Sequence, residues 1–446
     1  MQKQRQAHTG RLGLAVGAGL CLVALAHPVF VDRAELAVAV TLAILSAAAW
    51  AAIGEGSASG LPRVAWWLAI SWLLGLLVSA WMHQSWEFHA LLPPTLSAAL
   101  LWLGARVGKS GSGTRVGHWL VGAATITALH AALQHVSADP LGRLDEFPGR
   151  VVGPFDNPNH LGSFAALALP LALAGYVRLT CRSARRHWGL GLLQGGFVVT
   201  IYTGLLLAGS RGAIWAAAAG SLVTIVCSAR ALHLRSQRPA WLPLLLLALA
   251  STGVTRLLQE QPIMQGPTGQ VSVGQRLEAL PNIAGEAAKS DVTVLHRRVL
   301  WRAGWEIFLA RPLFGVGPGG YQLACATAVA GMSQDPRVAT LSRLDRLDIT
   351  RFAHNEWLHS LAETGLAGTV PWTILVFYWV WISARAFWRG TGWLHWGALG
   401  ACSSVLIHGL VSYPFFLPAT AGCFWILLGI TLYCGSRVPE PCEDTR

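Results

Sequence analysis

Arg211 has a position in the chain that suggests chemistry. It stands between Ser210 and Gly212 in an otherwise apolar hairpin. Glycine lets the backbone turn tightly there, so the guanidinium is free to point into a helix bundle, and its planar fork of donors can bind a phosphate through two hydrogen bonds. The alternative is that Arg211 only extends along the membrane to the interface.

A second group of cations lies between residues 294 and 310. Apolar residues recur there at helical period, and His296, Arg297, Arg298 and Arg302 form a basic face. The pattern predicts an amphipathic helix that lies along a membrane surface. These cations either clamp a lipid-linked diphosphate, whose charge needs at least two converging arginines, or form a solvated face against anionic lipid.

His354 is the candidate general base. It precedes Asn355 where a polar segment ends and an apolar span begins. An imidazole titrates near neutral pH, so His354 there could take a proton from an acceptor hydroxyl, although a lone histidine is more often structural. Glu363 is a carboxylate close to the membrane that either orients a partner or caps a helix.

Five further polar residues are possible supporting members of the same site. Asn157, Asn159 and His160 flank Pro158, but Asn-Pro is also an ordinary turn initiator. His408 and Tyr413 lie at the end of a late span, where a histidine and an interfacial tyrosine need no chemistry. The four polar clusters are all expected on one aqueous side, which packing between spans alone does not predict.

No metal and no other cofactor is expected. The eight cysteines include no Cys-x-x-Cys pair, so a thiolate metal site is not indicated. The outer segments hold no Asp-x-Asp motif, and Asp345 and Asp348 have the wrong spacing. A site without metal must neutralise a leaving diphosphate with arginine, which this sequence has in quantity.

The elements that must position these residues are membrane helices. The chain has 446 residues, of which 53% are hydrophobic and 12% charged, whereas soluble domains carry roughly 25% charged residues. Apolar stretches long enough to cross a bilayer recur along the whole chain. The sequence therefore predicts an all-α polytopic membrane protein with about twelve spans, at residues 11–30, 34–54, 64–82, 90–106, 117–136, 160–178, 188–208, 212–229, 240–256, 365–384, 394–411 and 417–434.

The net charge of +12 is divided among loops rather than gathered in one basic patch, which argues against nucleic-acid binding. The short loops on the side of the N-terminus hold most of the lysine and arginine. This bias predicts that both termini are cytoplasmic and that the long loop lies outside. A bacterial inner membrane is the simplest location, with the long loop in the periplasm.

The spans and the loop divide the chain into five expected parts. They are an N-terminal transmembrane scaffold (1–136), transmembrane helices with the NPNH and SRG motifs (137–256), a large periplasmic loop with amphipathic helices (257–354), C-terminal transmembrane helices (355–435) and a cytoplasmic tail (436–446).

Several segments are specific as a set, although none is specific alone. They are GPFDNPNHLGSFAALALPLALAG (153–175), the Ser-Arg-Gly turn (210–212), RRVLWRAGWEIFLARPLFGVGPGGY (297–321), AHNEWLHSLAETGLAG (353–368) and HGLVSYPF (408–415). Together they resemble the O-antigen ligase and polymerase superfamily of bacterial inner-membrane glycosyltransferases. The resemblance covers roughly residues 150–435.

This resemblance implies a GT-C-like helical fold and metal-independent transfer of a glycan from undecaprenyl diphosphate. Ligases deliver O-antigen to lipid A–core, polymerases extend the glycan on its carrier, and a third branch modifies pilin-like proteins. That branch often has an extra C-terminal soluble domain, and the short tail here favours a ligase. The partners are then the lipid-linked donor, the lipid A–core acceptor and membrane lipids.

The resemblance also implies roles for single residues. Arg211 and Arg297 match the family's arginines at the diphosphate, and His354 matches its base. Arg298 is adjacent and is an alternative to Arg297. A different class stays open, namely a transporter or flippase for a lipid-linked anion, although no internal repeat typical of transporters is visible.

Overall fold

The computed structural model describes residues 14–20, 61–85, 88–137, 150–181, 188–234, 241–266, 269–280, 291–344, 347–389 and 392–436. The predicted spans 11–30 and 34–54 lie mostly or wholly outside these residues. The other ten predicted spans fall on helices. These are α4 (Arg63–His83), α5 (Phe88–Ser110), α6 (Gly113–His135), α7 (Pro158–Cys181), α8 (Trp188–Ala208), α9 (Arg211–Leu234), α10 (Trp241–Leu258), α16 (Glu356–Arg389), α17 (Trp393–His408) and α18 (Pro418–Ser436).

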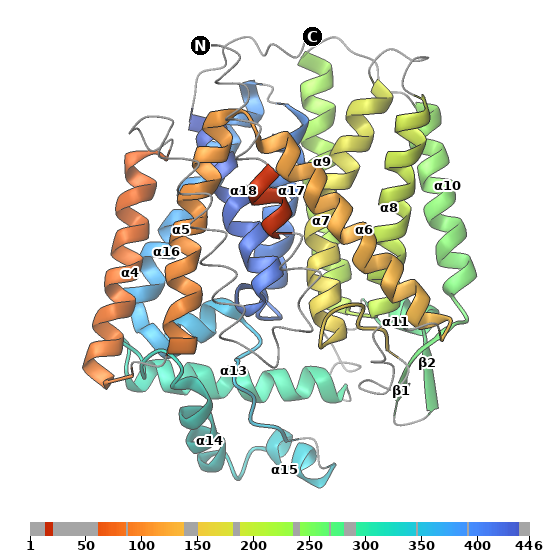
Figure 1. Ribbon diagram of the computed structural model, residues 1–446. Coiled ribbons are helices and arrows are strands. Elements are labelled where there is room, and N and C mark those ends of the chain that lie inside the picture. The colour runs from red at the N-terminus through yellow and green to blue at the C-terminus, as the bar shows by residue number, and fades with distance from the viewer. Residues whose placement is uncertain are drawn as a thin grey trace.

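Seven helices in the described part of the chain are long and apolar enough to cross a membrane, namely α4, α6, α7, α8, α9, α16 and α18. They stand side by side as a bundle (Figure 1). The prediction of an all-α polytopic membrane protein is confirmed. Within the bundle α7 and α18 are buried along nearly their whole length, as expected for helices that are apolar on every face.

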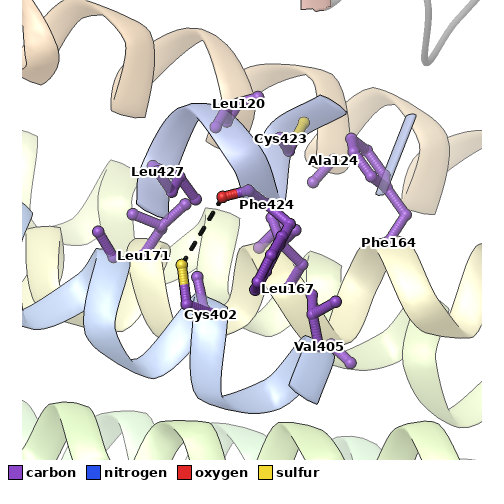
Figure 2. Close-up of a cluster of buried hydrophobic side chains, with 14 of the residues drawn as sticks. Leu120, Ala124, Phe164, Leu167, Leu171, Cys402, Val405, Cys423, Phe424 and Leu427 are labelled. Atoms are coloured by element: carbon purple, nitrogen blue, oxygen red, sulfur yellow. Dashed lines mark hydrogen bonds between the residues drawn. The ribbon is translucent and has the colours of Figure 1, made fainter. Parts of the chain in front are cut away.

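The centre of the bundle is closely packed side chains from four helices. Figure 2 shows Leu120 and Ala124 of α6, Phe164, Leu167 and Leu171 of α7, Cys402 and Val405 of α17, and Cys423, Phe424 and Leu427 of α18. Lipid tails are as apolar as these side chains, so van der Waals packing, rather than the hydrophobic effect, holds such helices together. This rigid centre carries the helix ends at which the candidate site residues lie.

The segment between α10 and α16 forms a cap over one end of the bundle. The predicted amphipathic helix is α13 (Val292–Ala310), which lies across the ends of the spans, with α14 (Tyr321–Gly331) and α15 (Pro336–Arg343) on its outer side (Figure 1). The sequence predicts amphipathic helices in this segment, but residues 294–310 are the only range that it predicts for one. We refer below to this end as the α13 end of the bundle.

A small hairpin in the same segment was also not predicted. Strand β1 (Pro262–Gly266) pairs in antiparallel fashion with β2 (Gly269–Ser272). Only two residues separate the strands and both flanking residues are glycine, which suits a tight hairpin. The hairpin leads into α11 (Val273–Glu278), which begins with a capping box between Ser272 and Gln275.

The glycine-rich loop after α13 is locked to a kink in α16, and we call this contact the loop–kink interlock. Four backbone hydrogen bonds form it: Val316 N to Ala362 O (2.9 Å), Gly317 N to Glu363 O (2.9 Å), Leu366 N to Pro312 O (2.8 Å) and Ala367 N to Leu313 O (3.0 Å).

The kink itself requires glycine. Gly365 has φ 58° and ψ −156°, a conformation that is essentially restricted to glycine. A Cβ at Gly365 would lie 2.4 Å from the carbonyl carbon of Leu313. The interlock therefore joins the loop after α13 to the first part of α16.

Candidate active site

Arg211 is the first residue of α9 and lies inside the protein at the α13 end. Its Nη2 is 2.6 Å from Oδ2 of Asp291, and its side chain is only 10% exposed. Asp291 also caps α13, because its Oδ1 accepts the N–H groups of Thr293 and Val294. One carboxylate thus ties the start of α9 to the start of α13, and the Arg211 guanidinium points inward rather than toward an interface.

Three more arginines surround this pair. The Arg150 Nη2 donates to the carbonyl of Ala208 at 2.7 Å, and the Arg276 Nε donates to that of Gly209 at 3.2 Å. Arg297, one turn into α13, is close enough to Arg211, Arg276 and Asp291 for their charges to act on it. We call Arg150, Arg211, Arg276 and Arg297 the arginine cluster.

The arginine cluster is electrostatically crowded. Burial lowers the pKa of Arg150 to about 9, with the charge of Arg276 adding to the effect. Burial also lowers the pKa of Arg297 to about 10, and here the charge of Arg211 adds to it. Burial alone would raise the pKa of Asp291, but the Arg211 charge and hydrogen bond lower it overall.

Asp291 is one carboxylate against four guanidinium groups in the part of the chain that the structure describes. Like charges held together away from water are costly unless an opposite charge offsets them. The arginine cluster is therefore suited to bind a polyanion, and a diphosphate carries both the charge and the oxygen geometry that arginine forks match.

His354 lies beside the arginine cluster in an unusual backbone conformation. Its φ is 52°, in the left-handed region, which costs energy for a residue with a side chain. The Trp301 indole N–H donates to the His354 carbonyl at 3.3 Å and helps to hold this conformation. The imidazole ring lies edge-on to the Tyr413 ring, with centroids 4.9 Å apart.

The His354 imidazole is neutral at neutral pH. Burial lowers its pKa to about 3, and the charge of Arg297 contributes to the same effect. Its Nδ1 has no hydrogen-bond partner within the described residues. A neutral imidazole beside a polyanion site has one unprotonated nitrogen, and such a nitrogen can accept a hydrogen bond from a hydroxyl group.

His160, Tyr413 and His408 meet at the same place. His160 Nδ1 is 2.5 Å from Oδ1 of Asp156, and its Nε2 is 3.3 Å from the Tyr413 hydroxyl oxygen. His408 is buried and its Nδ1 is 2.9 Å from the Ser163 hydroxyl. His408 is close enough to Arg297, His160 and His354 for their charges to act on it.

The asparagines of the site hold helix ends. Asn157 Oδ1 accepts the backbone N–H of Asn159 at 2.8 Å at the start of α7. Asn355 Oδ1 accepts the N–H of Leu358 at 3.0 Å at the start of α16, and its Nδ2 donates to the carbonyl of Leu410 at 3.1 Å. Asn157 and Asn355 thereby orient the helices that carry or follow His160 and His354.

Comparison with known proteins gives an independent indication. Residues 196–373 match the family model for O-antigen ligase. This segment is therefore similar to the O-antigen ligase family. The match includes Arg211, Arg276, Arg297 and His354, so the resemblance seen in the sequence is confirmed over this range. No individual curated protein matches the chain.

Two residues selected from the sequence lie apart from the arginine cluster. Arg302 pairs with Asp335 at 2.7 Å and with Glu306 at 3.0 Å on the exposed side of α13. Glu363 Oε1 accepts the N–H of Tyr321 at 3.2 Å and so caps α14. Capping a helix was one of the two roles that the sequence analysis left open for Glu363.

The structure also distinguishes Arg297 from Arg298. The charge of Arg297 acts on His354, His408 and Tyr413, as expected for a residue that faces the site. Arg298 is the next residue on the helix, about 100° around its axis, and it is not among the charged neighbours of these three residues. Arg297 is therefore the arginine of this pair that lies in the cluster.

Sequence reasoning missed five residues of the site. They are Arg150, Asp156, Arg276, Asp291 and Glu356. One signal was available for Asp291, because an aspartate just before an amphipathic run is a typical N-cap. Glu356 is buried beside His354, and its Oε1 accepts the Phe415 N–H at 2.8 Å. Nothing in the local sequence of Arg150 or Arg276 separates them from other loop arginines.

Proposed function

We propose that the protein is an O-antigen ligase of the bacterial inner membrane, with its site on the periplasmic side. In this proposal it transfers O-antigen polysaccharide from undecaprenyl diphosphate to a sugar hydroxyl of lipid A–core, without metal and with inversion at the anomeric carbon. The observation that carries the proposal is the arginine cluster, which lies beside the neutral imidazole of His354 at one end of a membrane bundle.

The arginine cluster supports binding of the donor's diphosphate. Arg211 and Arg297 converge on the space next to Asp291, and Arg276 adds a third cation there. As the bond between the anomeric carbon and the diphosphate breaks, negative charge grows on the leaving oxygen. Cations that are already in position stabilise that charge without having to rearrange, which is commonly the largest contribution to catalysis.

His354 is the proposed general base. In the empty site Arg297 is one of the groups that keep the pKa of His354 low. A bound diphosphate offsets the charge of Arg297, so the imidazole becomes more basic when the donor is present. His354 then engages the acceptor hydroxyl, whose oxygen attacks the anomeric carbon from the face opposite the diphosphate. A single direct displacement of this kind inverts the anomeric centre.

A lipid-linked donor also needs a place for its hydrocarbon. A cavity of about 580 Å³ lies between α7, α8, α9 and α10, lined mainly by apolar side chains that include Leu173, Val198, Ile225, Leu244 and Leu247. On α9 its lining begins at Ser221, ten residues and about 15 Å of helix from Arg211. The cavity thus supports only a long substrate, whose charged head lies at the α13 end and whose apolar tail follows the bundle toward the opposite end.

The direct test uses the purified full-length protein in detergent, with undecaprenyl-diphosphate-linked O-antigen and lipid A–core. We expect transfer by the wild type and a loss of about 10²–10⁴-fold in His354→Ala, because that is the usual contribution of a positioned proton acceptor. His354→Ala must elute and unfold as the wild type does. A His354→Ala enzyme that transfers at the wild-type rate would remove the base assignment.

Two further experiments separate the alternatives. Deleting the gene and examining lipopolysaccharide on a gel should leave core without the long ladder if the protein is a ligase. A core with one repeat indicates a polymerase, and an intact ladder with altered pilin mobility indicates a protein-directed transferase. Translocation of the lipid-linked glycan in liposomes, with no transfer in detergent, indicates a transporter.

A further inference from the structure

Another cavity lies between α4, α5, α16 and α18, and we call it the α4–α16 cavity. The volume open to the centre of a water molecule is about 90 Å³, and roughly 10–15 Å³ is enough to hold one water molecule. The cavity can therefore hold a group of several heavy atoms. It reaches the α13 end of the bundle at Glu356, the first residue of α16.

Much of the cavity wall is aromatic. Five rings line it, from α4, α16, α18 and the short helix η1 (Pro414–Phe416), namely Trp72, Trp372, Phe415, Phe416 and Trp425. The rings of Trp72 and Trp425 stack with centroids 5.4 Å apart, and Phe415 lies edge-on to Trp372 at 5.4 Å. The face of an aromatic ring is electron-rich and attracts a cation, and tryptophan attracts it most strongly.

Two carboxylates belong to the same wall, those of Glu356 and Glu363. Each has one oxygen engaged by the backbone, because Glu356 Oε1 accepts the Phe415 N–H at 2.8 Å and Glu363 Oε1 accepts the Tyr321 N–H at 3.2 Å. Within the described residues neither carboxylate pairs with an arginine or a lysine, and the charged neighbour that acts on Glu356 is Glu363. The wall thus presents acidic groups that lack a strong cationic partner.

His359 completes the polar part of the wall. Its side chain is buried, and its Nε2 is 3.5 Å from Glu363 Oε2, a distance at the limit of hydrogen bonding. Its Nδ1 has no hydrogen-bond partner in the described part of the chain. Buried polar atoms nearly always have a partner, so a side chain of this kind on a cavity wall indicates that a bound molecule supplies one.

These features select the chemistry of a ligand. Buried carboxylates are costly unless a cation offsets them, and the aromatic faces attract a cation as well. Both features disfavour a phosphate or another anion. A metal ion is a poor fit, because no group of three or more metal-ligating side chains is present in the described residues. An organic ammonium group satisfies the carboxylates and the rings together.

The place of the cavity in the bundle indicates where such a group comes from. Helix α4 stands at the edge of the bundle (Figure 1) and packs against α16. Its outer face exposes apolar side chains, among them Trp67, Leu74 and Trp81, as expected for a helix in contact with lipid. A lipid beside α4 would have its headgroup at the border of the membrane, and the carboxylate of Glu356 lies at that end of the cavity.

We propose that the α4–α16 cavity binds the ammonium headgroup of a membrane lipid of the phosphatidylethanolamine type. Glu356 and Glu363 offset the charge of the ammonium group, the tryptophan and phenylalanine rings surround it, and the lipid chains stay outside against α4. This site is separate from the arginine cluster, and its occupancy does not depend on glycan transfer.

The first test compares two lipids on the purified full-length protein by native mass spectrometry in a non-ionic detergent. One is phosphatidylethanolamine, and the other is the same lipid with its amine acetylated, which keeps the chains and the phosphate and loses the ammonium charge. We expect the first lipid to bind about tenfold more tightly or better, since charge-assisted hydrogen bonds and a desolvated cation–π contact are both lost in the second. This comparison requires no variant.

The second test locates the ammonium group with Glu356→Gln. The amide oxygen can still accept the Phe415 N–H, so the contact at the start of α16 is kept while the negative charge is lost. Glu306→Gln is the matched control, because Glu306 pairs with Arg302 on the exposed side of α13. We expect the preference for phosphatidylethanolamine to disappear in Glu356→Gln and to keep its wild-type size in Glu306→Gln.

Each outcome supports or overturns the proposal. Equal binding of the two lipids by the wild type overturns it, and so does a preference that survives in Glu356→Gln. A third ligand, methyl glucosaminide, carries an ammonium group on a sugar without lipid chains. If that sugar displaces phosphatidylethanolamine from the wild type at equal concentration but not from Glu356→Gln, the cavity binds an amino sugar and the lipid assignment is wrong.

Discussion

Replacing Arg297 with glutamine should lower activity without lowering stability. Burial and the charge of Arg211 lower the pKa of Arg297 to about 10, so the folded protein holds this charge at a cost. A pKa lowering of that size corresponds to a destabilisation of the folded protein by at most about 3 kcal/mol. Water around the half-buried guanidinium reduces this destabilisation to roughly 1 kcal/mol. Asp291 keeps its ion pair with Arg211 in the variant, so no partner is left unpaired.

The rate of glycan transfer, in contrast to the stability, should fall in Arg297→Gln. If Arg297 stabilises the leaving diphosphate, its removal takes away one positioned donor, and such a loss typically lowers kcat by about 10²–10³-fold. Arg298→Gln is the matched control on the same helix, because Arg298 lies outside the arginine cluster. A substitution away from such contacts usually changes the free energy of unfolding by about 0.5 kcal/mol or less, so the control should keep the Tm of the wild type. It should also keep the transfer rate, because Arg298 does not act on the residues of the site.

The assay measures initial rates of glycan transfer at saturating acceptor and thermal unfolding by tryptophan fluorescence in the same detergent. We expect Arg297→Gln to be almost inactive with a Tm equal to or above that of the wild type. Equal losses of activity in the two variants would refute the distinction between Arg297 and Arg298. A lower Tm in Arg297→Gln would show that the cluster is a stabilising network rather than a crowded anion site.

Three other predictions follow from single contacts. Arg211→Lys keeps the charge but loses the planar fork, so kcat should fall by roughly tenfold or more; normal transfer would mean that Arg211 does not bind the diphosphate. Gly365→Ala should lower the free energy of unfolding by about 3 kcal/mol, through left-handed strain and the clash with Leu313. Gly253→Ala, in the interior of α10 with open space around it, should not lower Tm in thermal unfolding, because alanine favours a helix interior. His354 has a lowered folded-state pKa of about 3, so the unfolded state binds more protons below about pH 6.5; relative to His354→Gln, the wild type should lose Tm as the pH falls from 7 to 4, and parallel curves would contradict the neutral imidazole.

Local patterns in the sequence were enough to predict the scaffold. Apolar stretches of membrane length can satisfy their backbone groups only as helices, and the predicted spans from 64–82 onward fall on helices. The amphipathic period of residues 294–310 likewise predicted α13. The positions of Arg211 at a turn and of His354 at the mouth of a span selected both for the site, because each is a polar residue at the border of an apolar run.

The sequence did not predict which residues join Arg211 in the arginine cluster. Arg150 and Arg276 look like ordinary loop residues in the sequence, and the N-cap pattern of Asp291 does not predict its pairing with Arg211. These residues join Arg211 only because the hairpin, α11 and the cap of α13 fold back over the α8–α9 turn. Similarly, His160 and Tyr413 form a hydrogen bond although they are 253 positions apart in the chain.

The sequence by itself determined the membrane helices, the amphipathic helix and the kind of charge that the site would carry. Only the tertiary structure decided that Arg297 rather than Arg298 faces the site, that Glu363 caps α14, and that Arg302 pairs with Asp335 outside it. The physical reason is the separation along the chain of the residues that interact. Hydrogen bonding and lipid burial act on neighbouring residues and leave a periodic pattern, whereas a polyanion site is defined by charges a few ångströms apart in space, whose separation along the chain leaves no pattern.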